Sequence, residues 1–227
     1  MNWKYKRFLN LVTTIIVTTS STTTAFLTSV SRKTCYDSPY SLKSPTCYMS
    51  VSLPEPNDSK FGRQDYWNQF YEEQQEEGSF SWYSNWNELE PFCREILGEP
   101  YNDDQKEEQR HVLVPGVGND ALLKDMYDSG YKHITAFDYA AAGVECQKQL
   151  LGSRISNINL VVADARNLPF SNSSFDSVID KGTLDAIYLS GGNDKVLGQK
   201  HLNMAVSELA RVLKPNGTTS NVPLRFI

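Results

Sequence analysis

The stretch Val112-Leu113-Val114-Pro115-Gly116-Val117-Gly118-Asn119-Asp120-Ala121 decides the fold class of this chain. It reads as a short apolar strand that runs into a turn with two glycines, and the turn opens a helix predicted over residues 121–129. Glycines permit a tight turn and a close approach of the backbone to a ligand, and a helix N-terminus supplies free N–H donors. This order of strand, glycine turn and helix indicates the first unit of an α/β fold.

The alternation continues toward the C-terminus. Further strands are predicted over residues 134–137, 160–163 and 177–179, and further helices over residues 143–151 and 201–213. Strands that alternate with helices predict an α/β fold built on a doubly wound parallel sheet, with the Rossmann-like arrangement. Such sheets bind ligands at the carboxyl ends of their strands.

Aromatic side chains crowd the region before this core. Within residues 56–98, Trp67, Phe70 and Tyr71 have the spacing of one helical face. A second amphipathic helix is predicted from Trp86, Leu89, Cys93, Ile96 and Leu97. We therefore expect one domain over residues 56–227, with an N-terminal helical aromatic cap at 56–98 and the sheet core at 110–227. Taken alone, these aromatics are better explained as ordinary packing between helices.

Residues 1–55 differ in composition and are predicted to be a targeting leader or a disordered tail. No acid precedes Asp37, and a basic start is followed by an apolar run over residues 8–17 and small residues up to Ala25, which is the layout of a secretory signal. A Ser-rich, acid-poor stretch follows and resembles a transit peptide, so the whole resembles the two-part leader of algal secondary plastids. Plastid, secretory and cytoplasmic destinations stay open. The apolar run is shorter than the roughly 20 residues that span a bilayer, so we expect no stable membrane span in the mature chain.

Charge and cysteine spacing exclude two classes of site. The chain has 227 residues and a net charge of −5, and it carries no basic domain of the kind that binds nucleic acid. Its four cysteines show no C-x-x-C spacing, and no histidine stands at zinc-ligand spacing from them, so no metal site is predicted.

The second strand ends in an acid. A carboxylate at Asp138 can accept hydrogen bonds from both hydroxyls of a ribose, and it stands 20 residues past Gly118. This spacing also fits the G-x-G-x-x-A pattern of a NAD-dependent oxidoreductase. At this point a dehydrogenase, and a tight turn that binds nothing, both stay open.

The third strand end separates these alternatives. Asp164 and Ala165 follow that strand, and an acid there can accept from the amino group of an adenine. Leu168-Pro169-Phe170 then leads to Phe175-Asp176-Ser177-Val178-Ile179, a pattern typical of methyltransferases and not of dehydrogenases.

A longer signature makes the resemblance concrete. Asp180-Lys181-Gly182-Thr183-Leu184-Asp185-Ala186 is similar to the signature of a eukaryotic branch of methyltransferase-like proteins, which includes lysine methyltransferases of elongation factor 1-alpha. The branch also carries Tyr66-Trp67-x-x-x-Tyr71, Trp82-Tyr83, Gly116-x-Gly118-Asn119, Asp138-Tyr139 and Asp164-x-Arg166. From about Asp65 to Gly217, the chain thus resembles a class I methyltransferase that depends on S-adenosylmethionine.

The resemblance implies S-adenosyl-L-methionine as cofactor and a site for it. Trp67, Tyr71 and Trp82 would close over the cofactor from the cap. Gly116 and Gly118 would let its methionine end lie against the first turn.

The strand ends would hold the remainder of the cofactor. Asp138 would bind the ribose and Tyr139 would lie against the adenine. Asp164 and the backbone of Ala165 would read the adenine edge, and Lys181 would lie beside the methionine carboxylate or the substrate.

The activity implied is methyl transfer to a protein lysine. Trp82, Tyr83 and Trp86 are candidates for a face that holds the lysine ammonium, and Asp185 is an acid near the acceptor, although a helix-start residue in solvent explains it better. We assign no catalytic base. A small-molecule methyltransferase is the alternative.

The C-terminal end supports a further alternative, a non-catalytic truncated fragment. After Gly217 the text lacks the apolar fifth strand, and no sequence remains for the closing strands that class I enzymes add. We therefore expect the C-terminal strands to be missing.

Overall fold

The structure is a computed structural model that describes residues 13–16, 60–74, 79–81, 84–100 and 110–215. Within this part of the chain, no helix is long and apolar enough to cross a membrane. We expected residues 218–227 not to form the fifth strand of the sheet. These residues lie outside the described part.

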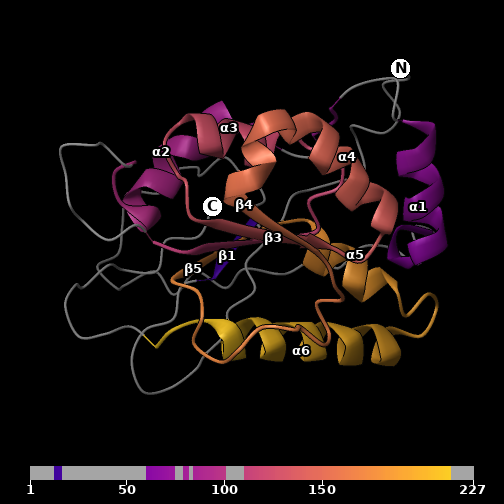
Figure 1. Cartoon of the computed structure of the whole chain (residues 1–227). Coiled ribbons are helices and arrows are strands. Elements are labelled where there is room, and N and C mark those ends of the chain that lie inside the picture. Colours follow the sequence, from indigo (N-terminus) through magenta and orange to yellow (C-terminus); the bar gives the residue numbers. More distant parts are fainter. Residues whose placement is uncertain (1–12, 17–59, 75–78, 82–83, 101–109, 216–227) are drawn as a thin grey trace, which may run out of the picture.

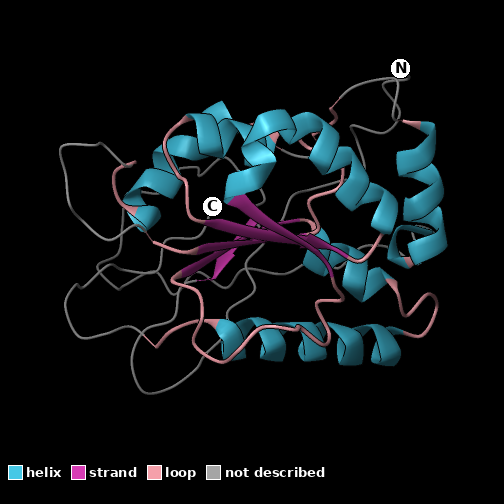
Figure 2. Ribbon diagram, viewed as in Figure 1, coloured by secondary structure: helices cyan, strands magenta, loops and turns pink. Residues whose placement is uncertain are grey.

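Four parallel strands form the centre of the sheet (Figure 2). They are β2 (Val112–Pro115), β3 (Ile134–Asp138), β4 (Ile158–Val162) and β5 (Ser177–Lys181), and they lie in the order β5-β2-β3-β4. The chain thus places β3 and β4 on one side of β2 and then crosses to the other side for β5. This reversal beside β2 is the point at which doubly wound sheets bind ligands, and it confirms the predicted fold class.

A short strand from the N-terminal region lies at the edge of the sheet. β1 (Thr13–Ile16) pairs antiparallel with β5, with Thr14 opposite Asp180. It falls within residues 1–55, which we expected to be a leader or a tail, and the rest of that range lies outside the described residues.

Helices cover both faces of the sheet (Figure 1). On one face lie α2 (Trp86–Leu97), α3 (Leu122–Asp128) and α4 (Ala141–Leu151), followed by the 3-10 helix η3 (Gly152–Asn157). On the other face lie α5 (Thr183–Leu189) and α6 (Lys195–Val212), whose apolar side chains form a second core cluster. β2 and β3 are therefore buried along their whole length between the two layers, whereas β4, at the edge of the sheet, is partly exposed.

The predicted elements of the core are confirmed with two differences. The helix expected over residues 201–213 begins earlier, because the side chain of Asp194 accepts hydrogen bonds from the N–H groups of Val196 and Leu197 and starts α6 there. No helix was predicted at α5, whose first four residues, 183–186, belong to the signature that begins at Asp180. Gly182, with φ +93°, precedes α5 and turns the chain into it.

The expected cap divides between two places. The remaining helix α1 (Gln64–Glu73) packs against α4, with Trp67 and Tyr71 buried and Phe70 half-buried on the predicted face. By contrast, α2 packs against α3 and contributes Trp86 and Leu89 to the main core. Of the two helices, only α1 therefore covers the carboxyl ends of the strands.

Candidate cofactor site

A cavity lies at the carboxyl ends of β2, β3, β4 and β5, beneath α1. Its volume is about 110 Å³, and it is open to solvent. Eight of the ten predicted cofactor-binding residues line it: Trp67, Tyr71, Gly116, Asp138, Tyr139, Asp164, Ala165 and Lys181. Gly118 lines a smaller adjoining cavity, and the two cavities share Tyr71, Gly116 and Lys181. Trp82 lies outside the described residues.

The aromatic wall of the cavity comes from α1. The rings of Trp67 and Tyr71 stack with their centroids 5.5 Å apart, and the indole Nε1 of Trp67 donates to the carbonyl oxygen of Phe61 at 2.6 Å. Phe61 and Gly62 also line the cavity. A Cβ at Gly62 would overlap the backbone of Ser190, so this glycine allows the entry of α1 to lie directly against the end of α5.

Both glycines of the first turn have left-handed backbone. Gly116 has φ +57° and its Cα faces the side chain of Thr183, whose hydroxyl donates to the carbonyl of Pro115 at 3.1 Å. Gly118 has φ +48°, and a Cβ there would overlap the hydroxyl of Tyr71. The turn therefore needs glycine at both positions, for conformation and for space.

Asp138 ends β3 inside the cavity wall. Its Oδ2 accepts from the N–H of Gly118 at 2.9 Å and its Oδ1 from the N–H of Ala140 at 2.8 Å. Burial raises the pKa of this carboxyl to about 6, although the two backbone hydrogen bonds oppose the shift. Two carboxylate oxygens offer about four acceptor sites, so the ionised group can still accept the two hydroxyls of a ribose.

Asp164 follows β4 at the other end of the cavity. The guanidinium of Arg166 binds it through Nε at 3.0 Å and Nη2 at 2.6 Å. Burial alone would raise the pKa of Asp164, but the hydrogen bonds from Arg166 outweigh burial and lower it. Arg166 belongs to the motif Asp164-x-Arg166, but its pairing with this acid was not predicted from the sequence. Tyr139 and Ala165 complete this part of the wall.

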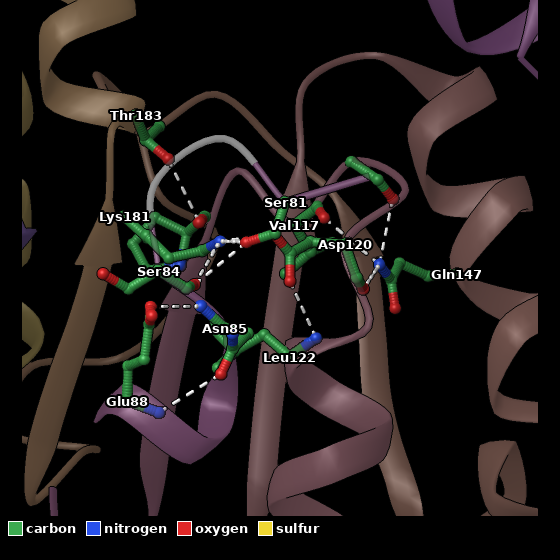
Figure 3. Close-up of polar contacts among 12 residues, drawn as sticks. Ser81, Ser84, Asn85, Glu88, Val117, Asp120, Leu122, Gln147, Lys181 and Thr183 are labelled. Carbon is green, nitrogen blue, oxygen red and sulfur yellow. Dashed lines mark hydrogen bonds and ion pairs between the residues drawn. The ribbon is translucent and has the colours of Figure 1, made fainter. Parts of the chain in front are cut away.

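Lys181 reaches away from the sheet toward the first turn and the segment before α2 (Figure 3). Its ammonium forms an ion pair with Asp120 and donates to Ser81 Oγ at 2.7 Å and to the carbonyl of Ser84 at 3.3 Å. Lys181 lines the cavity, and its polar contacts are with Asp120, Ser81 and Ser84. Its place beside the methionine carboxylate or the substrate stays a prediction.

The candidates for a face that holds an ammonium fare differently. Trp86 is wrong as a candidate, because it is 3% exposed, packs edge-on against Tyr131 and donates through Nε1 to Ser129. Trp82 and Tyr83 lie outside the described residues. Asp185, on the first turn of α5, lines the cavity and is half-buried there.

These residues fit a nucleoside cofactor. The cavity wall is mostly apolar, and carboxylates stand at two strand ends, where ribose hydroxyls and an adenine amino group need acceptors. Among the described residues, no group of three or more His, Cys, Asp or Glu side chains is placed to hold a metal ion.

Comparisons with known proteins agree with this geometry. Residues 113–220 match a family described as "Methyltransferase domain". The mouse protein named "eEF1A lysine and N-terminal methyltransferase" is 32% identical over 167 residues, which cover 74% of this chain and 22% of that protein. The mouse "EEF1A lysine methyltransferase 4" is 31% identical over 169 residues, which cover 73% of this chain and 62% of that protein.

The chain thus spans about a fifth of the length of the first of these relatives. Among solved structures, a putative S-adenosyl-L-methionine-dependent methyltransferase from Methanococcus maripaludis matches at 14% identity, with a TM-score of 0.44, over 74% of this chain and 64% of that one. The family match, the two relatives and the residues of the cavity lead to one assignment. The chain belongs to the class I, S-adenosylmethionine-dependent methyltransferases and resembles the branch that includes the elongation factor 1-alpha lysine methyltransferases.

Proposed function

We propose that this protein transfers a methyl group from S-adenosylmethionine to the side chain of a protein lysine. The observation that carries the proposal is the cavity, with Asp138 and Asp164 at two strand ends and Asp185 on α5. The choice of lysine rests on the two relatives named as lysine methyltransferases.

The cofactor would lie across the strand ends. Asp138 would accept its ribose hydroxyls and Asp164 its adenine amino group, while Trp67 and Tyr71 would cover it from α1. When bound, S-adenosylmethionine supplies a methyl group activated by the neighbouring sulfonium.

The chain's own residues would position the acceptor and exclude water. In the reaction a bond forms between the lysine nitrogen and the methyl carbon, the bond from that carbon to sulfur breaks, and the nitrogen loses a proton to solvent. A lysine with the ordinary pKa near 10.4 must be neutral to react, and an apolar wall lowers the pKa of an amine. Asp185 is placed to orient the amine as it enters, because an ionised carboxylate accepts hydrogen bonds from it.

Incubation of the full chain with S-adenosylmethionine labelled in its methyl group and a protein extract tests this proposal. We expect label in protein and, by mass spectrometry, methylated lysine, with less of both for Asp185→Ala. Asp125→Ala is the matched control, since Asp125 lies in α3 and does not line the cavity. Label found only in small molecules would contradict the lysine assignment. If calorimetric titration of the full chain with S-adenosylmethionine shows no binding, the assignment as a methyltransferase is contradicted.

For the destination of the chain we propose a plastid, on the composition of residues 1–55 alone. Residues 1–55 fused to a fluorescent protein in an alga with secondary plastids should direct fluorescence to the plastid. Fluorescence in the cytosol or in the secretory pathway would contradict this.

A further inference from the structure

Three segments far apart in the sequence meet at one ammonium group (Figure 3). Lys181 stands at the carboxyl end of β5, Asp120 follows the glycine turn of β2, and Ser81 and Ser84 belong to the segment before α2. We call Lys181 with Asp120, Ser81 and Ser84 the Lys181 clamp. It joins Lys181 to residues that precede it by 61 to 100 positions along the chain.

The ammonium is fully used inside the clamp. A lysine ammonium has three N–H donors, and Lys181 has three acceptors: a carboxylate oxygen of Asp120, the hydroxyl of Ser81 and the carbonyl of Ser84. The side chains of Lys181 and Asp120 are 7% and 13% exposed. A buried ion pair tolerates the loss of one partner poorly, because the remaining charge stays buried without compensation.

Asp120 connects the clamp to the glycine turn. Its Oδ1 accepts from the N–H of Leu122, the first residue of α3, at 2.9 Å. Its carbonyl accepts from Nε2 of Gln147 at 2.7 Å, and the same Nε2 reaches the carbonyls of Val117 at 3.1 Å and Gly118 at 3.0 Å. The turn is therefore fixed from α4 on one side and from β5 on the other.

The segment before α2 is fixed to the same turn. The N–H of Phe80 donates to the carbonyl of Asn119 at 3.2 Å. After Ser84, Asn85 and Glu88 form a capping box, in which each side chain accepts from the backbone N–H of the other residue. Movement of Ser84 would therefore move the start of α2.

We propose that Lys181 is a positioning residue, which holds the segment before α2 on the glycine turn and so fixes the shape of the cofactor cavity. It acts through Asp120 and does not bind the cofactor itself. The proposal rests on the proposed function only in that the turn lies against the cofactor. Lys181 and Asp120 both line the smaller cavity beside this turn, so a change in the clamp changes the cavity wall.

Hydrogen exchange of the full chain without any cofactor tests the clamp by itself. In Lys181→Met and in Asp120→Asn, we expect faster exchange at the amide of Phe80 and in the first turn of α2 than in the wild type. Lys148→Met is the matched control, because Lys148 forms an exposed ion pair with Glu145 on α4, and it should leave this exchange unchanged. Unchanged exchange in both clamp variants would overturn the proposal, whether or not the protein is a methyltransferase.

Calorimetry with S-adenosylmethionine separates positioning from direct contact. If Lys181 acts through Asp120, either single variant weakens binding about tenfold, and the double variant is little weaker than either one. If Lys181 binds the methionine carboxylate, Lys181→Met weakens binding while Asp120→Asn leaves it equal or stronger. This second outcome contradicts the proposal.

A milder variant covers the case in which both clamp variants fail to fold. Ser81→Ala removes one acceptor of Lys181 and leaves the ion pair with Asp120 in place. We expect faster exchange at Phe80 with a smaller loss of cofactor affinity, and no change in exchange would again contradict the clamp. The two proposals can also fail separately. If the clamp variants exchange faster than the wild type but the wild type does not bind S-adenosylmethionine, the proposed function is contradicted and the clamp is supported.

Discussion

Acid should weaken cofactor binding through one group, Asp138. Its pKa of about 6 in the free protein results from burial, and a ribose needs it as an acceptor, therefore ionised. With this pKa, about nine tenths of the protein carries ionised Asp138 at pH 7, and about one tenth at pH 5. If only the ionised form binds, affinity for S-adenosylmethionine falls about tenfold between these two values, which is about 1.4 kcal/mol.

The same raised pKa of Asp138 has the opposite effect on folding: acid weakens cofactor binding but stabilises the fold. Because the pKa of Asp138 in the fold lies above its ordinary value of 3.8, the fold binds this proton more tightly than the unfolded chain does. The contribution of Asp138 to stability is therefore full at low pH and falls as the pH rises from about 4 to about 6. Weaker binding at about pH 5 is thus not explained by unfolding through Asp138.

Isothermal calorimetry at about pH 5 and pH 7 measures this effect, with Asp138→Asn as the diagnostic variant. We expect the variant to bind weakly and with much less dependence on pH. Asp164 is a poor source of the same dependence, because its pKa is lowered and it stays ionised throughout. Equal wild-type affinity at both values, or the same slope in Asp138→Asn, would refute the reasoning.

Three further outcomes concern the turn and the buried titratable groups. Gly118→Ala should lower the unfolding free energy by about 1–2 kcal/mol for the left-handed backbone alone, and calorimetry should show weaker cofactor binding because Tyr71 must move; unchanged values would contradict the close contact. Burial and the stacked His133 lower the pKa of His111 to about 4, so its contribution to stability is full above pH 6.5 and is lost as the pH falls toward 4. In urea unfolding, the unfolding free energy of His111→Phe should therefore fall by about 1 kcal/mol less than that of the wild type between pH 7 and pH 5, and an equal fall would contradict this. Burial raises the pKa of Asp180 to about 7, so the contribution of this group to stability falls as the pH rises from about 4 to 7. Between pH 5.5 and pH 8, the unfolding free energy of Asp180→Asn should fall by about 2 kcal/mol less than that of the wild type in the same assay, and an equal fall would contradict this.

The parts of the site that lie at strand ends could be predicted from the sequence. A buried parallel strand is a continuous apolar run, and the residue that follows it must lie at the carboxyl edge of the sheet, so Asp138 and Asp164 could be placed from the text. Gly116 and Gly118 could be placed for the same reason, because a tight turn at that edge needs their backbone freedom.

The contacts between segments were not accessible in this way. The pairing of Lys181 with Asp120, and of Arg166 with Asp164, depends on the direction of long side chains, which has no period in the sequence. The separation of α1 from α2 was missed for a related reason, since both show one apolar face and only the packing decides against which helix that face lies. Gly62 carries a weak signal, a glycine just before a helix.

The crossover beside β2 also has a consequence for the order in which the protein can be made. During synthesis, β2, β3 and β4 leave the ribosome before β5, so the edge of β2 that later receives β5 has no parallel partner until the chain has passed Lys181. The glycine turn exists earlier, but the lysine that joins it to the segment before α2 is among the last parts of the sheet to emerge. A nascent chain arrested before β5 should therefore expose a bare strand edge, which is a template for pairing with other chains. Folding of the cofactor site is then a late event, because β5 and the residues of α5 that line the cavity are the last of its parts to emerge.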